Sequence, residues 1–215
     1  METMLKVLFI DAGTGYYRMK RYQVGDFFGP IDLGFHLTAN HGTFNIGAGL
    51  LAGSILPGSN RLFFVAYSPC WHNIFVSSMG GAGLIFDNLG LNMIALTGRA
   101  PVPSILYLNR DSGEEVEVEL SPVDTTAVWQ QGRGGTFALM EHALGRYGGR
   151  YKNEPRVLAV GPAAAESDFG AVASAPCRGG KLTSVDSWAG RGGLGSALLQ
   201  KFGVAAAVYG GTVVD

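Results

Sequence analysis

The sequence lacks the features that would point directly to a membrane or a nucleic acid. No apolar run reaches the roughly 20 residues that span a bilayer. The apolar run near the amino terminus is too short for a secretory signal. Lys and Arg number 16 against 17 Asp and Glu, so the formal net charge is −1. A charge so close to zero gives no electrostatic reason to expect DNA, RNA or an anionic membrane as a partner.

Cysteine and histidine are also scarce. Cys70 and Cys177 are the only cysteines, and two thiolates cannot hold an iron–sulfur cluster or an all-thiolate zinc ion. The four histidines are scattered, without the spacing of metal ligands. Few cysteines suit a reducing compartment, so we expect a cytoplasmic protein. The cations Arg178 and Lys181 could lower the pKa of Cys177, although a structurally inert thiol is the favoured interpretation.

Glycine, in contrast, is abundant and clustered. There are 33 glycines in 215 residues, against a usual share of about 7%. Three glycines of the cluster 78–83 recur 112 positions later in the cluster 189–195. A short helix-like segment and a strand-like run follow each cluster, which indicates an internal duplication with units of roughly 60–110 and 155–212. The segment 176–188 is then an insertion in the second unit, and the two glycine loops would face one ligand or a pair of ligands.

The pattern of apolar residues predicts a mixture of strands and helices. The strand and proline turn at 64–69 resemble those at 157–162, and we interpret each as the start of a repeated unit. A helix is expected over 136–147, entered through the glycine-rich loop 132–135, and a loop is expected over 40–45. Strands are expected at 5–11, 16–22, 62–67, 74–78, 93–98, 103–108, 115–120, 156–160, 169–175 and 205–210.

The glycine clusters have two open interpretations. A glycine loop that leads into a helix exposes backbone N–H groups and can bind an anion. Close packing between a helix and a strand would need the same glycines. Neither cluster continues with the Gly-Lys-Ser or Gly-Lys-Thr of a nucleotide-binding P-loop. Gly190, Gly192 and Gly195 fit the dinucleotide fingerprint, with Asp215 near the distance of its ribose-binding acid. The residues 185–188 that precede Gly190 make a poor strand, which disfavours that interpretation.

Arg61 also has two interpretations. It follows a glycine-rich segment and stands at the start of the strand expected over 62–67. An arginine in such a place is most often a solvated surface charge. The functional alternative is an anion clamp, because a guanidinium matches phosphate in a fork of two hydrogen bonds.

Five motifs occur along the chain in a distinctive order. They are Gly49-x-Leu51-x-Gly53-Ser54-x-x-Pro57-x-x-x-Arg61, Ser68-Pro69 with Gly80-Gly81 eleven residues after the proline, Gly98-Arg99-Ala100, Gly161-Pro162-Ala163, and Ala189-Gly190-Arg191-Gly192-Gly193-Leu194-Gly195-Ser196. Together they resemble the N-terminal domain of the aldehyde ferredoxin oxidoreductase family, the tungsten–pterin enzymes. The similarity extends from about Leu5 to Asp215.

This resemblance implies a fold and a cofactor. The fold would be α+β, with two stacked, mainly antiparallel sheets, flanking helices and an internal pseudo-twofold duplication, in a single domain over 1–215. Such a domain is the base on which two pterin dithiolenes (molybdopterin), chelating one tungsten or molybdenum atom, are laid. The implied function is the binding of this cofactor in an oxidoreductase that converts aldehydes to acids and passes electrons to a [4Fe-4S] cluster carried elsewhere.

The resemblance also assigns cofactor-binding residues, although it assigns no catalytic side chain. Backbone groups of Ser78 and Trp188 would help to place a magnesium ion between the two phosphates. One pterin and its phosphate would be held by Arg61, Ser78, Met79, Gly80 and Gly81, and the other by Ser187, Trp188, Ala189, Gly190, Arg191, Gly192 and Gly193.

In the family, the cluster cysteines and the proton-transfer glutamate and histidine lie on later domains. A partner chain or further domains would therefore carry them, ferredoxin would be reached only indirectly, and the chain would be inactive alone, although it could form oligomers. Two alternatives stay open. One is a non-catalytic carrier of a pterin or another phosphorylated ligand. The other is an interaction protein that kept the fold, since Ser78 stands where the family has asparagine and Trp188 where it has a small residue.

Overall fold

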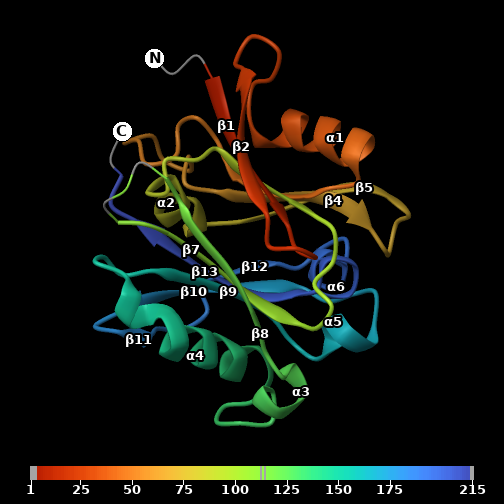
Figure 1. Ribbon diagram of the computed structural model, residues 1–215, viewed down its shortest axis with the longest axis vertical. Coiled ribbons are helices and arrows are strands. Elements are labelled where there is room, and N and C mark those ends of the chain that lie inside the picture. Colours follow the sequence, from red (N-terminus) through yellow and green to blue (C-terminus); the bar gives the residue numbers. More distant parts are fainter. Residues whose placement is uncertain (1–3, 112, 114, 214–215) are drawn as a thin grey trace.

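The computed structural model describes residues 4–111, 113 and 115–213. Within these residues the strands form two mixed sheets, and the fold is α+β as expected (Figure 1). The first sheet has the order β2-β1-β6-β3-β4-β5, from β1 (Met4–Asp11), β2 (Tyr17–Gln23), β3 (Phe44–Ala48), β4 (Leu62–Ser68), β5 (Asn73–Met79) and β6 (Met93–Thr97). The second has the order β11-β10-β9-β13-β7-β8, with β12 paired to β10, from β7 (Ser104–Arg110), β8 (Glu117–Pro122), β9 (Arg156–Val160), β10 (Val172–Arg178), β11 (Lys181–Leu182), β12 (Ser187–Ala189) and β13 (Val204–Gly211).

Helices flank these sheets. The two longest, α1 and α4, lie at opposite ends of the molecule with the sheets between them (Figure 1). The helices are α1 (Pro30–His41), α2 (Ala82–Asp87), α3 (Thr125–Val128), α4 (Gly135–Tyr147), the 3-10 turn η1 (Gly148–Arg150), α5 (Ala163–Glu166), α6 (Leu194–Ser196) and the π-helical η2 (Ala197–Lys201). In the described ranges, none of them combines the length and the apolar character needed to cross a membrane.

The two sheets repeat one pattern of strand pairing. In the first, β1 pairs antiparallel with β2 and parallel with β6, while β3 lies antiparallel between β6 and β4. In the second, β7 pairs antiparallel with β8 and parallel with β13, while β9 lies antiparallel between β13 and β10. The internal duplication is therefore present. The first repeat begins at β1, upstream of the expected unit 60–110. The second begins at β7, upstream of the expected unit 155–212.

One detail of the expected repeat is wrong. The segments 64–69 and 157–162 were matched because both contain an apolar strand followed by a proline. In the structure they lie in β4 and β9, which hold different places: β9 corresponds to β3, and β4 corresponds to β10. The resemblance was local, whereas a strand's place in a sheet depends on which distant strands pair with it.

The loop expected over 40–45 is also wrong, because α1 ends and β3 begins within that range. Asp32 caps the start of α1 by accepting a hydrogen bond from the Gly29 N–H at 3.0 Å. Gly42 ends the helix with a φ of 63° and donates its N–H to the Thr38 carbonyl. Only Gly42 and Thr43 separate the helix from the strand, so the sequence shows only a short interruption.

The core joins the two sheets. Its largest cluster draws on strands of both sheets and on α2, α4 and α6. The Phe86 ring of α2 packs edge-on against the Tyr209 ring of β13, with 5.8 Å between centroids. The Tyr209 hydroxyl also donates to the Ala82 carbonyl at 3.0 Å. The segment that follows the first glycine cluster is thus fixed to the second sheet by a buried hydrogen bond and an aromatic contact.

The helix predicted over 136–147 is confirmed as α4. It buries Met140, Leu144 and Tyr147 against the second sheet and leaves His142 exposed, as its apolar stripe indicates. The glycine-rich loop 132–135 enters this helix and does not join the other two glycine loops.

Candidate functional site

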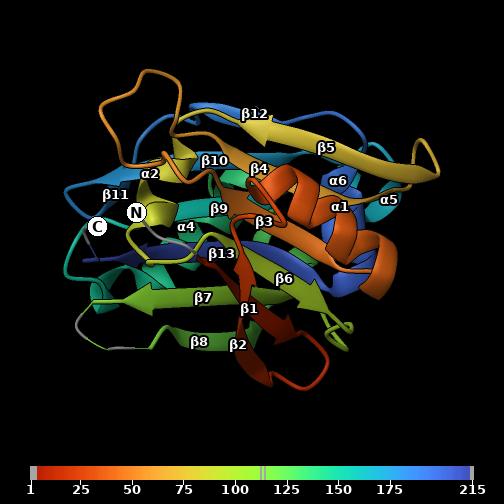
Figure 2. The same ribbon diagram turned by 90° about the horizontal axis from the view of Figure 1, so that it is seen from above.

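The two glycine loops lie side by side, although more than 100 residues separate them in the sequence. The Ser187 hydroxyl donates to the Gly80 carbonyl at 2.5 Å, and the Ser68 hydroxyl donates to the Gly192 carbonyl at 2.6 Å. The strands β5 and β12 that carry the loops are neighbours, as Figure 2 shows. The two glycine loops of the duplicated units are therefore neighbours in this structure.

Arg61 stands at one end of this double loop. Its Nη2 donates to the Ser78 hydroxyl at 2.7 Å, and the side chain is exposed. Ser78 is half-buried on β5, so it fixes the direction of the guanidinium without neutralising its charge. The arginine is thus a held cation whose remaining N–H groups are available for an oxyanion.

Left-handed backbone shapes both loops. Gly81 has a φ of 71° and Gly193 a φ of 62°, where a side chain is strained. A Cβ on Gly193 would overlap the Asp168 carbonyl oxygen and lie 2.7 Å from the Cys70 sulfur. A Cβ on Gly80 or Gly190 would meet nothing within 4 Å. Some of these glycines are therefore needed for packing, while others leave the loop surface open.

The expected anion site at the helix N-termini is not supported by the hydrogen bonds. The helices α2 and α6 contain six and three residues, too few to develop a substantial dipole. Their first N–H groups are bonded within the protein: Ala82 to the Gly80 carbonyl at 2.8 Å, Gly83 to that of Asn60 at 3.0 Å, and Gly195 to that of Gly170 at 2.9 Å. Positive charge at the site comes from the exposed side chains of Arg61 and Arg191.

An ion pair with a buried arginine lies next to the loops, and the sequence analysis did not predict it. The Arg156 guanidinium, on a residue that is 4% exposed, bonds to Asp186 and donates from Nε to the Ser174 hydroxyl at 2.7 Å. A Cβ on Gly81 would lie 3.8 Å from both ionic groups. The pair therefore joins the segment before Ser187 to β9 and lies close to Gly81 of the first loop. The sequence feature that could have revealed this ion pair is an arginine as the first residue of the otherwise apolar strand β9.

An apolar hollow of about 420 Å³ adjoins the second loop. Trp71, Phe75 and Phe169 line it together with Cys70 and residues 190–193. The rings of Trp71 and Phe75 are stacked, with 6.4 Å between centroids and an interplanar angle of 18°. Phe169 is 76% exposed. The site thus has a cationic end near Arg61 and an aromatic end near Gly192.

The structure brings the residues assigned by the resemblance into one region but exposes them unequally. Arg61, Gly81, Trp188, Gly190 and Arg191 are exposed. Ser78, Gly80 and Ser187 are half-buried. Met79, Ala189, Gly192 and Gly193 are buried, so these four shape the loops and offer little side-chain surface to a ligand. No group of three His, Cys, Asp or Glu side chains suited to a metal ion occurs among the described residues.

The two cysteines should differ in reactivity. Burial and the Glu154 carboxylate raise the pKa of Cys177 to about 11, so the lowering considered for Arg178 and Lys181 is not found. Its thiolate fraction at pH 8 should be about 100-fold smaller than that of an unperturbed thiol, because each pKa unit is worth a factor of ten. Cys70 is only partly buried. With iodoacetamide at pH 8, peptide mass spectrometry should find Cys70 labelled first, and equal labelling of both thiols would contradict this structure.

Comparison with known families agrees with the geometry. Residues 8–210 match the sequence model of a domain described as aldehyde ferredoxin oxidoreductase, N-terminal domain. That range is nearly the whole chain. The chain belongs to the aldehyde ferredoxin oxidoreductase family. It is similar, at 38% identity over 172 residues, to glyceraldehyde-3-phosphate:ferredoxin oxidoreductase of Pyrococcus furiosus, and at 34% over 174 residues to an uncharacterised protein of Methanocaldococcus jannaschii.

These family relatives are much longer than the chain. The two alignments cover 77% and 78% of the chain but only 26% and 25% of the relatives. The chain thus spans about a quarter of their length. Among solved structures, the active site complex BamBC of benzoyl coenzyme A reductase with 1,5-dienoyl-CoA is similar, with a TM-score of 0.75 at 21% identity. That match covers 96% of the chain and 30% of the other, and shows a shared fold.

Proposed function

We propose that this chain is the cofactor-binding base of an oxidoreductase, and that its two glycine loops hold a bis-pterin complex of tungsten or molybdenum. The observation that carries the proposal is the side-by-side position of the loops, which Ser187 and Gly80 join by a hydrogen bond. A cofactor with two similar halves suits a site made by duplication. The family membership adds support, because its members are oxidoreductases.

The residues present fit such a group. Gly80 and Gly190 leave open space where a side chain would stand, so a flat molecule can approach the backbone. Arg61 and Arg191 supply two exposed guanidinium groups for phosphate. The stacked pair of Trp71 and Phe75 offers an aromatic wall beside the second loop. A planar, phosphorylated ligand needs these three features together.

Each part of the site would then have a defined task. Arg61, held by Ser78, would bind a phosphate of the first pterin, and Arg191 would serve the second. Backbone groups of Ser78 and Trp188 would help to hold a magnesium ion between the phosphates. The buried pair of Arg156 and Asp186 would keep the loops in register without touching the ligand. When bound, the metal–pterin group would supply the two-electron oxidation of an aldehyde to an acid.

The complete reaction would need more protein than this chain. The chain spans about a quarter of its relatives, and Cys70 and Cys177 are its only cysteines. An iron–sulfur cluster with four thiolate ligands must therefore be carried by further domains or by a partner chain. We propose that such a unit covers the glycine loops, receives the electrons and passes them toward a ferredoxin.

The first test is the metal and pterin content of the chain purified from its native host, together with its native mass. Tungsten or molybdenum with pterin, in a complex heavier than the 22.7 kDa chain, is the expected result. The same cofactor on a lone chain would favour a carrier. Finding neither metal nor pterin on an intact fold would contradict the proposal and favour an interaction protein.

Replacing Arg61 by alanine should weaken cofactor retention. Loss of a charge-assisted contact costs about 1.5–3 kcal/mol, which corresponds to about 10- to 150-fold in affinity. Metal bound per chain, measured by mass spectrometry during dilution, gives the readout. Arg178→Ala removes another exposed arginine, at the end of β10, and serves as the matched control. Equal metal loss from both variants would refute the assigned role of Arg61.

A further inference from the structure

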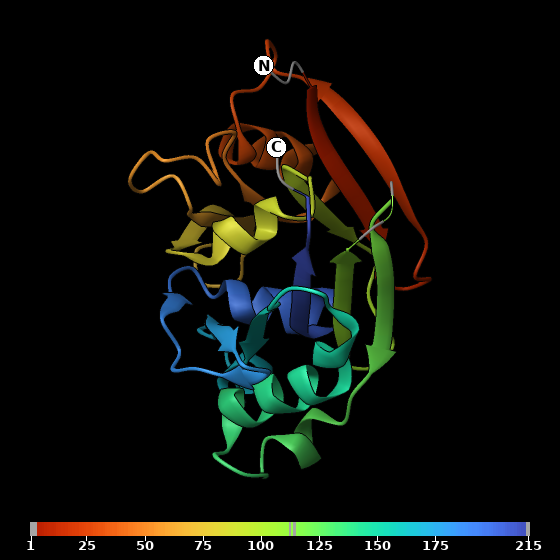
Figure 3. The ribbon, with the colours of Figure 1, turned by 90° about the vertical axis from the view of Figure 1, so that its left-hand side faces the viewer.

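The strand β2 forms a free edge of the first sheet. Its partner β1 lies on one side, and no strand of the described ranges pairs with it on the other. The hairpin of these two strands stands at the border of the molecule, away from the two glycine loops (Figure 3). An edge strand presents backbone N–H and C=O groups that can pair with a strand of another molecule. The proposed cofactor site does not use this edge.

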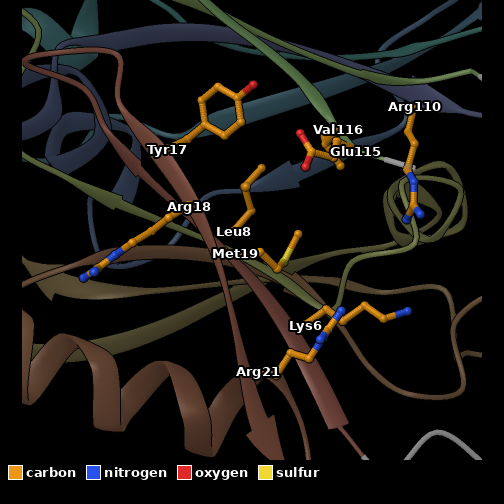
Figure 4. A pocket seen from close by; sticks show the side chains of 9 residues that line it. All are labelled: Lys6, Leu8, Tyr17, Arg18, Met19, Arg21, Arg110, Glu115 and Val116. Carbon is orange, nitrogen blue, oxygen red and sulfur yellow. The ribbon is translucent and has the colours of Figure 1, made fainter. Parts of the chain in front are cut away.

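Two cations occupy one face of β2. Arg18 and Lys20 are two positions apart in the strand, so their side chains share a face. The Arg18 guanidinium lies 6.0 Å, and the Lys20 Nζ 4.9 Å, from the centre of the Phe9 ring in β1. In Figure 4, Arg18 leaves the hairpin on one side, whereas Met19 and Arg21 lie on the other. The ring holds the two cations side by side, because its face attracts positive charge.

No carboxylate of the described residues forms an ion pair with these two cations. The ion pairs found in the described ranges involve neither Arg18 nor Lys20. On neighbouring segments, Asp11 accepts hydrogen bonds from backbone N–H groups of its own turn, and Asp32 accepts those at the start of α1. Two cations held close together without a counter-ion favour an acidic ligand.

The uncharged residues of the edge suit a protein partner. Tyr16 and Tyr17 are 66% and 38% exposed, and Met19 is 42% exposed. Tyrosine, methionine and arginine are enriched in interfaces between proteins. Backbone pairing along a strand is available to another polypeptide, and not to a nucleic acid or a lipid. The edge therefore favours an extended segment of a protein as its ligand.

A second copy of β2 is a poor occupant of this edge. Arg18 and Lys20 would then meet the same cations on the added strand, and like charges on adjacent strands destabilise a sheet. Charged residues on edge strands hinder self-pairing in this way. They also select a strand of opposite charge. The acidic residues of such a strand must alternate, because only every second side chain lies on the face of Arg18 and Lys20.

We propose that β2 binds an extended acidic segment of a partner protein, which adds a strand to the edge of the first sheet. Two acidic residues of the segment, separated by one residue, would lie beside Arg18 and Lys20. Main-chain hydrogen bonds to β2 would supply affinity, and the alternate side chains would supply specificity. The inference does not depend on a pterin being bound at the glycine loops.

An NMR titration of the isotope-labelled, 215-residue chain with a peptide of alternating threonine and glutamate tests the proposal. Saturable shifts are expected at the backbone amides of β2, and binding should weaken as salt is added. A peptide of alternating proline and glutamate has the same charge, but its prolines cannot donate backbone hydrogen bonds. It should bind about tenfold more weakly. Absence of shifts at β2, or equal binding of the two peptides, would overturn the inference.

Two variants assign the binding to this edge. Arg18→Glu places a negative charge beside the added strand and should weaken binding of the threonine–glutamate peptide by about tenfold or more. Arg178→Glu reverses another exposed arginine, at the end of β10, and should leave the binding unchanged. Equal weakening by both variants would mean that the peptide responds only to net charge, and the inference would be wrong.

The other occupants of the edge have distinct signatures. Tighter binding of a DNA oligonucleotide than of the peptide would indicate a nucleic acid as the ligand and would overturn the inference. Dimers of the purified chain in which the β2 amides are protected from hydrogen exchange would also overturn it, since a second copy would then occupy the edge.

Discussion

Replacing Gly193 by alanine should lower the free energy of unfolding by about 3 kcal/mol or more. The residue has a φ of 62°, which strains any side chain. Its Cβ would overlap the Asp168 carbonyl oxygen and lie 2.7 Å from the Cys70 sulfur. The Asp168 carbonyl also accepts a hydrogen bond from Cys70 at 2.7 Å, so it cannot move without breaking that contact. The backbone strain and the steric overlap both destabilise the folded state, and Gly193 is buried, so the new methyl group cannot move into solvent.

Urea denaturation of the chain and of Gly193→Ala gives the comparison. Gly190→Ala is the matched control, because it lies three residues earlier in the same loop and its Cβ would meet nothing within 4 Å. Its unfolding free energy should stay within about 0.5 kcal/mol of the parent. A control as unstable as Gly193→Ala would mean that the loop tolerates no side chain, and equal stability of all three proteins would contradict the loop geometry.

Replacing Asp186 by alanine should lower the free energy of unfolding by about 2–3 kcal/mol. The change leaves the Arg156 guanidinium buried without its counter-ion. This loss of stability should be smaller than for a fully buried ion pair, because the Asp186 side chain is 38% exposed and water can reach the vacated position. The segment before Ser187 should also loosen, which increases hydrogen exchange at Ser187 and Gly80.

An exposed ion pair provides the comparison for Asp186. Arg133 and Glu141 are 2.7 Å apart, with side chains 49% and 45% exposed. Glu141→Ala should cost no more than about 0.5–1 kcal/mol, because exposed pairs contribute little. Thermal unfolding followed by circular dichroism measures both variants. If the two substitutions were equally harmless, Arg156 would not depend on its partner, and its support of the glycine loops would be disproved.

Much of the fold could be predicted from local sequence patterns. Alternating apolar residues located most strands, and the stripe of Met140, Leu144 and Tyr147 located α4. The patterns failed at the end of α1, because the helix and β3 are separated by only two residues. They also matched β9 with the wrong strand of the first sheet. Both errors concern boundaries or partners, which depend on contacts between distant residues.

The candidate site was predicted only in part. Glycine spacing located the two loops, and the predicted neighbours Arg61 and Ser78 are joined by a hydrogen bond. The anion site at the helix N-termini was not found, since no sequence pattern reveals that Gly83 and Gly195 donate to carbonyls elsewhere in the chain. Arg156 was missed because its counter-ion lies 30 residues away.

The sequence by itself determined the duplication, the α+β class and the family, because these rest on repeated spacing and on the order of motifs. Only the tertiary structure decided which strands correspond, which glycines are needed for packing, and which charges are buried or exposed. The contact between the two glycine loops is the clearest case, since 107 positions separate Ser187 from Gly80. Packing of the two sheets around a shared core brings such residues together, and contacts between residues so distant in the chain leave no local pattern in the sequence.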